Sequence, residues 1–383
     1  MNRPKVLVVG FLPPPQEGTA KITEIIVGSS ILSDKFQIEF IALEKSKVAE
    51  QRGKLSIANM MNNLINYIRF FTCIVLRQPD LVYLPLAQNT IGFLRDTVFV
   101  VTAKSFRRRI CVHFHGGNFD LFYQDQWSVY QWYIRMVIRR IDDIILLAEK
   151  FKLHFEPFIS GSRLHVLYNC YPGTMPLVSK KDRARSVFRV VFIGYLSKAK
   201  GALDLVRAAS RIIHNNLRNI EFILCGQPVD IERNVVFVPD TKNAYSKMKA
   251  IVSDILCHEK IQLMPPVDDN AKDELLRSAD LFVFPTYSEG CGIVALEAMA
   301  YGVPLITTAV GALSEMLKSN ENCLFVGPGN IDELVRAIIR IHDDAYLRKC
   351  MAENNLTAVR NQFNKDTYIN RLSNIWYNCL AHT

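Results

Sequence analysis

PTYSEGCGIVALEAMAYGVPLITTAVG, residues 285–311, is the stretch that decides the fold. It follows an apolar run, Leu281 to Phe284, with the composition of a buried parallel strand. Glycines then turn the chain into a run of helix-forming residues, Ile293 to Tyr301. Strand, glycine turn and helix in this order predict one unit of a doubly wound α/β sheet.

The turn itself has the properties of an anion site. Gly290 and Gly292 flank Cys291 and lack side chains, so backbone N–H groups can approach a ligand closely. The positive end of the helix dipole points the same way. We therefore predict that Gly290, Cys291 and Gly292 bind a phosphate group.

Two carboxylates flank the turn. Glu289 precedes the predicted helix and Glu297 lies within it, so the two would contact different parts of one elongated ligand. Carboxylates accept hydrogen bonds from hydroxyl groups, the commonest donors on a sugar. The alternative is a capping Glu289 and a Glu297 that faces solvent. The surrounding glycines and strands favour the interpretation that both carboxylates bind a ligand.

This stretch resembles the Glu-x7-Glu signature of the GT-B-fold retaining glycosyltransferases of family 4, also called glycosyl transferases group 1. The resemblance rests on the Pro-x-x-x-Glu-Gly opening and the Glu-Ala-Met-Ala-x-Gly-x-Pro continuation. It implies an α/β protein of two Rossmann-like domains that face each other across a cleft. In such a site Glu289 would hold hydroxyls of the donor sugar and Glu297 those of the ribose.

An early loop also resembles the family. The strand from Lys5 to Val9 is followed by a proline-rich loop and by a predicted helix from Lys21 to Leu32. Family members place two glycines in this loop, where it contacts the donor diphosphate and the acceptor. Only Gly18 matches, because Glu17 occupies the first glycine position. A plain connecting loop is the alternative.

A second glycine turn follows the predicted strand that starts at Ile110 and ends at Phe114 or His115. Ligands bind outside the carboxyl ends of parallel strands, so this turn is predicted to face the cleft. The resemblance implies that His115 bonds a sugar hydroxyl near the reacting carbon, with His113 less favoured. A histidine with a purely structural role is the alternative.

The second half opens with a strand from Phe188 to Ile193 and a helix from Ala202 to Ile213. Between them the family places Gly-Arg and then Lys-Gly, whose two cations hold the leaving diphosphate. Lys200 and its following glycine match, but Tyr195 replaces the arginine. Lys198 is the residue that could supply the missing charge, or it could simply be solvated.

A charged patch at residues 180–185 follows a Pro- and Gly-containing segment and predicts the domain linker. We expect an acceptor-side domain at residues 1–175, a nucleotide-sugar domain at 176–365 and a final helix at 366–383 that crosses back to the first domain. The remaining predicted strands are 38–43, 81–84, 144–147, 164–168, 221–225, 235–238, 262–264, 301–306 and 322–326, and the remaining predicted helices are 57–78, 126–140, 149–158 and 332–342.

Composition excludes several classes of protein. The 383 residues are 49% hydrophobic and 22% charged, as in ordinary globular proteins. The nine cysteines are scattered singly, without metal-type spacing, and no Asp-x-Asp is present, so neither a disulfide framework nor a metal site is predicted. Nothing resembles a nucleic-acid-binding motif.

The net charge of +9 is uneven, since residues 1–172 carry 21 Lys/Arg against 14 Asp/Glu. The arginines at 107–109 and at 135, 139 and 140 could lie against an anionic membrane or a pyrophosphate-bearing acceptor, or at solvated helix ends. No leader and no apolar stretch of spanning length are evident. A cytoplasmic protein is expected, with peripheral attachment to the inner face of the membrane as an option.

The resemblance implies a metal-independent, retaining hexosyltransferase that uses a UDP- or GDP-linked donor and a glycan or lipid-linked acceptor in cell-surface polysaccharide synthesis. The catalytic set would be His115, Glu289 and Lys200. One alternative is a GT-B sugar-nucleotide epimerase or phosphorylase. Another is a catalytically weak glycan-binding or scaffolding relative, which the changes at Glu17 and Tyr195 favour.

Overall fold

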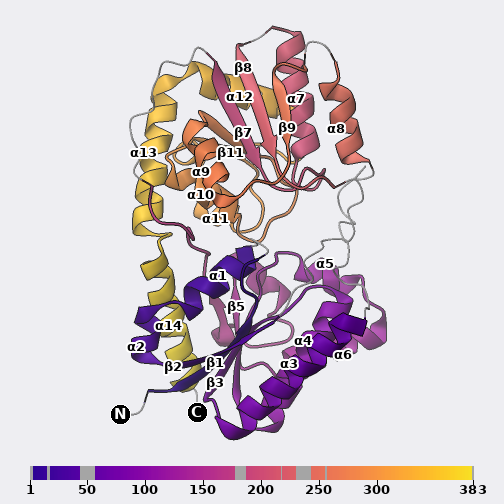
Figure 1. Cartoon of the computed structure of the whole chain (residues 1–383), viewed down its shortest axis with the longest axis vertical. Coiled ribbons are helices and arrows are strands. Elements are labelled where there is room, and N and C mark those ends of the chain that lie inside the picture. The colour runs from indigo at the N-terminus through magenta and orange to yellow at the C-terminus, as the bar shows by residue number, and fades with distance from the viewer. Residues whose placement is uncertain are drawn as a thin grey trace. The chain divides into compact units, whose positions relative to one another are not determined.

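The structure is a computed structural model, and it describes residues 3–14, 18–43, 57–176, 187–216, 218–229, 243–254 and 257–381. The chain forms two compact units (Figure 1). Unit 1 comprises residues 1–172 and 364–383, and unit 2 comprises residues 173–363. In the described residues each unit contains one six-stranded parallel sheet. None of the helices in the described residues combines the length and apolar character that crossing a bilayer requires.

Unit 1 has the strand order β2-β1-β3-β4-β5-β6. Its elements are β1 (Lys5–Gly10), α1 (Gly18–Val27), α2 (Ser30–Lys35), β2 (Gln37–Ala42), α3 (Ile57–Leu76), β3 (Leu81–Pro85), α4 (Thr90–Ser105), β4 (Arg109–His113), α5 (Phe119–Gln124), α6 (Ser128–Ile138), β5 (Asp143–Leu146), 3₁₀ helices at Glu149–His154 and Gly161–Arg163, β6 (Leu164–Val166) and α14 (Lys365–Ala381).

Unit 2 has the strand order β12-β11-β10-β7-β8-β9. Its elements are β7 (Phe188–Ile193), α7 (Ala202–His214), β8 (Ile220–Cys225), α8 (Ala244–Val252), β9 (Ile261–Met264), α9 (Asp269–Ser278), β10 (Leu281–Phe284), α10 (Ile293–Ala300), β11 (Leu305–Thr307), α11 (Leu313–Met316), β12 (Cys323–Phe325), α12 (Ile331–Asp343) and α13 (Ala345–Asn361).

The two parallel sheets confirm the predicted α/β class with two Rossmann-like units. In unit 2 the direction of strand succession reverses between β7 and β10, which are hydrogen-bonded neighbours. Ligands in such sheets bind beyond the carboxyl ends of the strands at this switch point. A ligand site is therefore expected at the two segments that follow these strands, residues 194–201 and 285–292.

Some predicted elements differ from the observed ones. The helix expected from Lys21 to Leu32 is two helices, because the Ser29 side chain accepts a hydrogen bond from Leu32 N and starts α2. Strand β4 ends at His113, before the two residues proposed as its end. Helices α4 and α5 were not predicted. Glu17, the linker at 180–185 and the strand at 235–238 lie outside the described residues.

Helix α14 completes the core of unit 1 although it comes last in the described sequence. It packs against α2, β3 and β4. Trp376 on α14 is fully buried, with its ring 5.4 Å from those of both Phe36 and Tyr83. Aromatic side chains of this size dominate the energetics of a core. The sheet of unit 1 is thus covered on this face by residues from the far end of the chain.

Candidate functional site

The two segments at the switch point of unit 2 are bonded to each other. The amide of Tyr287 donates to the carbonyl of Ala199 at 2.8 Å, and the Thr286 hydroxyl donates to the same oxygen at 3.2 Å. Gly201 has φ +76, and a Cβ placed there would lie 2.1 Å from the carbonyl oxygen of Pro285. Only glycine allows this approach of the two backbones.

This join brings Lys200 and Glu289 together. The ammonium of Lys200 lies 2.8 Å from Oε2 of Glu289 and donates to the carbonyl of Ser288 at 3.2 Å. The other oxygen, Oε1, accepts from the amide of Gly290 at 3.2 Å. Both side chains are partly exposed, 26% for the lysine and 19% for the glutamate, so an entering anion can reach the lysine.

The backbone of Glu289 and Gly290 packs closely against the backbone of Gly311 and Ala312. Gly311 has φ +51, and a Cβ there would lie 1.8 Å from the carbonyl oxygen of Glu289. The amide of Ala312 donates to the carbonyl of Gly290 at 2.9 Å. Gly292, with φ +71, then begins α10. The first amides of a helix have no carbonyl partner within it, so they and the helix dipole favour an anion beside Lys200.

Glu297 lies on α10, one turn into the helix, and is 7% exposed. Its Oε1 is 2.7 Å from the ammonium of Lys272 on α9, which also lies 3.0 Å from Asp269. The pairing keeps a nearly buried carboxylate compensated. Lys272 was not identified from the sequence, because it stands in the middle of an ordinary charged helix without a motif.

Lys198 is not brought to the ion pair of Lys200 and Glu289. It is buried, and its ammonium pairs with the carboxylate of Asp204 at the start of α7. The hydroxyl of Tyr287 donates to the other oxygen of that carboxylate at 2.8 Å, and burial followed by this bond raises the pKa of Tyr287. The structure thus places Lys198 in an internal polar cluster.

The predicted residues of the first half lie in unit 1. Gly18 is the first residue of α1, and His115 follows β4. The His115 ring lies 4.0 Å from that of His113, whose Nδ1 is 2.7 Å from the hydroxyl of Tyr83. Burial, with a smaller effect of His115, holds the pKa of His113 well below its usual value. His113 therefore has the properties of a neutral core residue.

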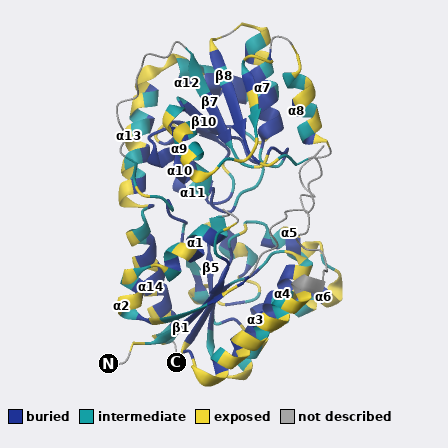
Figure 2. Ribbon diagram, viewed as in Figure 1, coloured by how far each residue is buried: buried dark blue, intermediate teal, exposed yellow. Residues whose placement is uncertain are grey.

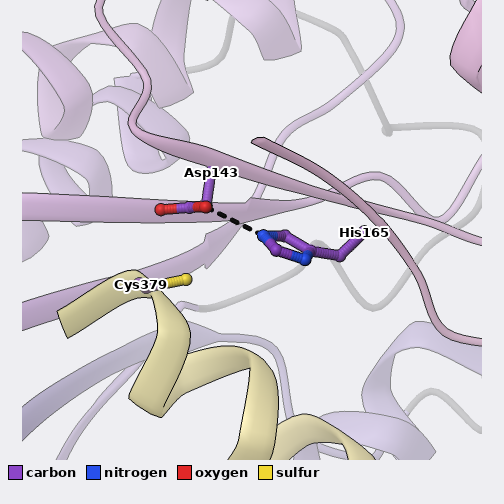
Figure 3. Close-up of side chains that lie close together, drawn as sticks. All are labelled: Asp143, His165 and Cys379. Carbon is purple, nitrogen blue, oxygen red and sulfur yellow. Dashed lines mark hydrogen bonds and ion pairs between the residues drawn. The ribbon is translucent and has the colours of Figure 1, made fainter. Parts of the chain in front are cut away.

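A second polar cluster lies inside unit 1, where Asp143, His165 and Cys379 come from β5, β6 and α14 (Figure 3). Their candidate ligand atoms lie within 4.8 Å of one another, which the separate positions in the sequence did not indicate. His165 Nε2 is 2.8 Å from Oδ1 of Asp143. A hydrogen bond with Cys111, and then burial, raise the pKa of the Cys379 thiol. A metal needs the thiolate, so this environment favours a structural role.

Removing the carboxylate should therefore destabilise the fold. Asp143→Ala leaves His165 without its buried acceptor, and we expect the free energy of unfolding to fall by about 2 kcal/mol. Urea denaturation followed by tryptophan fluorescence measures the change. Asp125→Ala, at an exposed position, is the matched control and should stay near wild type. Equal midpoints for the two variants would contradict the structural role.

Comparison with known proteins indicates the family to which part of this chain is similar. The family model described as "Glycosyl transferases group 1" matches residues 179–357. These residues belong to the glycosyl transferases group 1. An uncharacterised glycosyltransferase of Methanocaldococcus jannaschii is 27% identical over 192 residues, which cover 49% of this chain and 44% of that protein. The match thus spans less than half the length of this relative.

Solved structures resemble this chain over all or nearly all of its length. Sucrose-phosphate synthase from Thermosynechococcus elongatus has a TM-score of 0.73 at 16% identity, with 100% of both chains covered. The Anabaena protein Alr3699/HepE, solved with UDP and glucose, has a TM-score of 0.70 at 16% identity and covers 98% of this chain and 100% of its own. The predicted family is confirmed for residues 179–357, and the GT-B type of fold is confirmed for the chain as a whole. The roles of the individual site residues stay predictions.

Proposed function

We propose that this protein is a retaining glycosyltransferase that takes a hexose-type sugar from a nucleotide sugar without a metal ion. The observation that carries the proposal is the ion pair of Lys200 and Glu289 beside the first turn of α10, at the switch point of the unit 2 sheet. Membership of the group 1 glycosyl transferases supports it. The acceptor in this proposal is a glycan or a lipid-linked sugar of the cell surface, and the protein is cytoplasmic.

The leaving diphosphate would lie between the Lys200 ammonium and the amides that begin α10. As the bond to the sugar breaks, negative charge grows on the diphosphate, and these fixed donors stabilise it. In the structure Glu289 neutralises Lys200. A diphosphate competes for the ammonium, and the freed carboxylate oxygen can then accept a hydrogen bond from a hydroxyl of the donor sugar.

Glu297 suits the nucleoside end of the donor. One of its oxygens is held by Lys272, and the carboxylate still has acceptor capacity for the ribose hydroxyls. UDP is the nucleotide we favour over GDP, because the HepE structure was solved with UDP and glucose. The role of His115 in contacting the sugar stays a prediction from the family resemblance.

Ligand-induced thermal stabilisation tests the donor site. At a hundredfold excess over its dissociation constant, UDP should stabilise the native protein by about 2.7 kcal/mol, whereas GDP should do much less. Glu297→Ala removes a charged hydrogen-bond acceptor and should abolish most of the UDP shift. Glu297→Gln, which keeps the side-chain size, separates loss of binding from loss of folding. Glu321→Ala, at an exposed position, is the control.

Donor turnover separates the transferase from its alternatives. A transferase releases UDP slowly from a UDP-sugar in water. A phosphorylase instead cleaves a glycan with added phosphate and gives sugar 1-phosphate and the shortened glycan, and an epimerase inverts a carbon of the sugar while it stays bound in the UDP-sugar. A scaffold binds and releases the donor unchanged. A UDP shift without any turnover would therefore contradict the proposed activity while leaving the binding site intact.

A further inference from the structure

Three segments of unit 1 carry a net positive charge equal to that of the whole chain. They are residues 57–78, 90–109 and 126–140, which contain α3, α4 and α6, and we call them together the basic face. They hold ten Lys/Arg and one acidic residue, Asp96. The chain has 46 Lys/Arg and 37 Asp/Glu, so the remainder holds 46 − 10 = 36 and 37 − 1 = 36, a net charge of zero. Three of these cations are compensated by ion pairs: Arg95 pairs with Asp96, which is 3% exposed, and Arg77 and Lys104 pair with Glu39 and Asp142 outside the three segments. The remaining seven include the three arginines of α6 and its C-terminal end, at 135, 139 and 140.

The same helices expose large apolar side chains. Among the side chains that the structure describes, eight lie on α3 and four on α4, and they are 37% to 73% exposed: Met60, Met61, Leu64, Ile65, Ile68, Phe71, Val75, Leu76, Ile91, Leu94, Val98 and Val101. Their spacing of three, four and seven residues places them along one side of each helix. Within the described part of unit 2, the exposed large hydrophobic residues are two tyrosines, Tyr195 and Tyr346. Figure 2 shows exposed residues along α3 and α4.

The two apolar stripes lie side by side. Tyr67 of α3 donates its hydroxyl to the carbonyl of Arg95 on α4 at 3.0 Å. One turn further along, the Phe70 ring lies 4.9 Å from that of Phe99. Contacts that advance in the same order on both helices mean that α3 and α4 run in the same direction. Their exposed residues therefore form one surface of two helices' width, larger than the scattered apolar residues of an ordinary surface.

Cations and tryptophans border this surface on α6. Tyr130 of α6 donates its hydroxyl to the carbonyl of Thr90, which fixes α6 beside α4. Trp127 and Trp132 are 65% and 58% exposed. Trp132 also lines a groove of about 680 Å³ together with Arg135, Met136, Arg139 and Arg140. Apolar side chains flanked by tryptophan and arginine are the composition of helices that lie in the interface of a bilayer.

We infer that the basic face docks unit 1 onto an anionic lipid bilayer. Its apolar side chains enter the headgroup and acyl boundary, and the arginines of the α6 groove contact lipid phosphates. Charge decides between a bilayer and a second copy of the chain as the occupant. Self-association through this face brings two surfaces of the same sign together, whereas an anionic bilayer neutralises one. The inference fits a lipid-linked acceptor but does not depend on the proposed transferase activity.

Vesicle flotation of the full chain tests the inference. The probes are vesicles of phosphatidylcholine alone and vesicles with 30% phosphatidylglycerol, at low and at high salt. We expect flotation with the anionic vesicles at low salt, and much less with neutral vesicles or at high salt, because surface charges are screened. The absence of flotation with anionic vesicles at low salt would overturn the inference.

Two double variants separate the apolar and the charged contributions. Leu64→Asn with Ile68→Asn, at positions 51% and 57% exposed, removes apolar surface without changing the charge and should weaken binding roughly a hundredfold, about tenfold for each side chain. Arg139→Gln with Arg140→Gln should weaken it roughly thirtyfold, which corresponds to about 1 kcal/mol for each cation. Tyr346→Asn in unit 2, at a position 78% exposed, is the matched control and should bind like wild type.

Two further measurements show whether the variants still fold and whether the face instead binds a second copy of the chain. The melting temperature and the UDP-induced shift should be the same in all three variants as in wild type, because every altered side chain is solvent-exposed. Binding that survives both double variants would overturn the inference. So would a wild-type dimer that the α3 variant converts to a monomer, measured by light scattering, because that result would make a second copy the occupant of the face.

Discussion

Replacing Lys200 by methionine is expected to lower kcat for sugar transfer by about 10²–10³, the usual cost of removing one preorganised donor to a developing negative charge. Methionine keeps most of the length of the side chain but removes the ammonium that lies 2.8 Å from Glu289 and 3.2 Å from the carbonyl of Ser288. The charge on the leaving diphosphate would then be stabilised only by the amides that begin α10. Initial-rate measurements with saturating donor isolate this effect on kcat.

The matched control is Lys349→Met, since Lys349 is 71% exposed and forms only a long surface pair. It should leave the rate unchanged. Because the charge is stabilised by protein groups, addition of EDTA should leave wild-type activity unchanged as well. A Lys200→Met enzyme within threefold of wild type would remove Lys200 from the proposed mechanism, whatever the outcome for UDP binding.

Gly311→Ala is expected to damage both the stability of unit 2 and its donor site. The left-handed backbone at φ +51 costs a residue with a Cβ roughly 1–2 kcal/mol. The new methyl would also lie 1.8 Å from the carbonyl oxygen of Glu289, so the Glu289 segment must move. We expect a loss of at least about 2 kcal/mol of unfolding free energy and a UDP shift reduced to near zero.

Gly161→Ala is a direct control for this substitution. A Cβ at Gly161 meets nothing within 4 Å, so the variant should melt and bind UDP like wild type. Differential scanning fluorimetry with and without UDP measures both properties in one experiment. If Gly311→Ala retained the wild-type UDP shift, the close contact between the two segments would not position the donor site.

The local order of the donor region could be predicted from the sequence. A short, fully apolar run that ends at a proline, with a glycine turn shortly after it, is distinctive, and β10 was predicted with its observed bounds. The helix at α10 and the long α3 were also predicted to within one or two residues. These elements carry their own signals, because periodicity, glycine turns and a helix start depend on residues that are neighbours in the chain.

Contacts between distant residues could not be predicted in this way. Lys272 and Glu297 lie 25 positions apart on two helices, and only the folded sheet brings them together. Lys198 was a candidate for the diphosphate, but nothing local revealed that Asp204 and Tyr287 would enclose it. Helix α4 was missed because its apolar residues point both into the core and outward, so they show no single hydrophobic side.

The return of α14 to unit 1 affects how the protein is made. Unit 2, residues 173–363, is inserted between the two sequence segments that build unit 1. The aromatic cluster of Phe36, Tyr83 and Trp376 can form only after the ribosome has synthesised the last of these residues. Unit 2 is then already complete in sequence. We therefore expect the sheet of unit 1, although its strands are synthesised first, to be fully covered only after α14 has been made, and to be exposed to aggregation in the nascent chain until then.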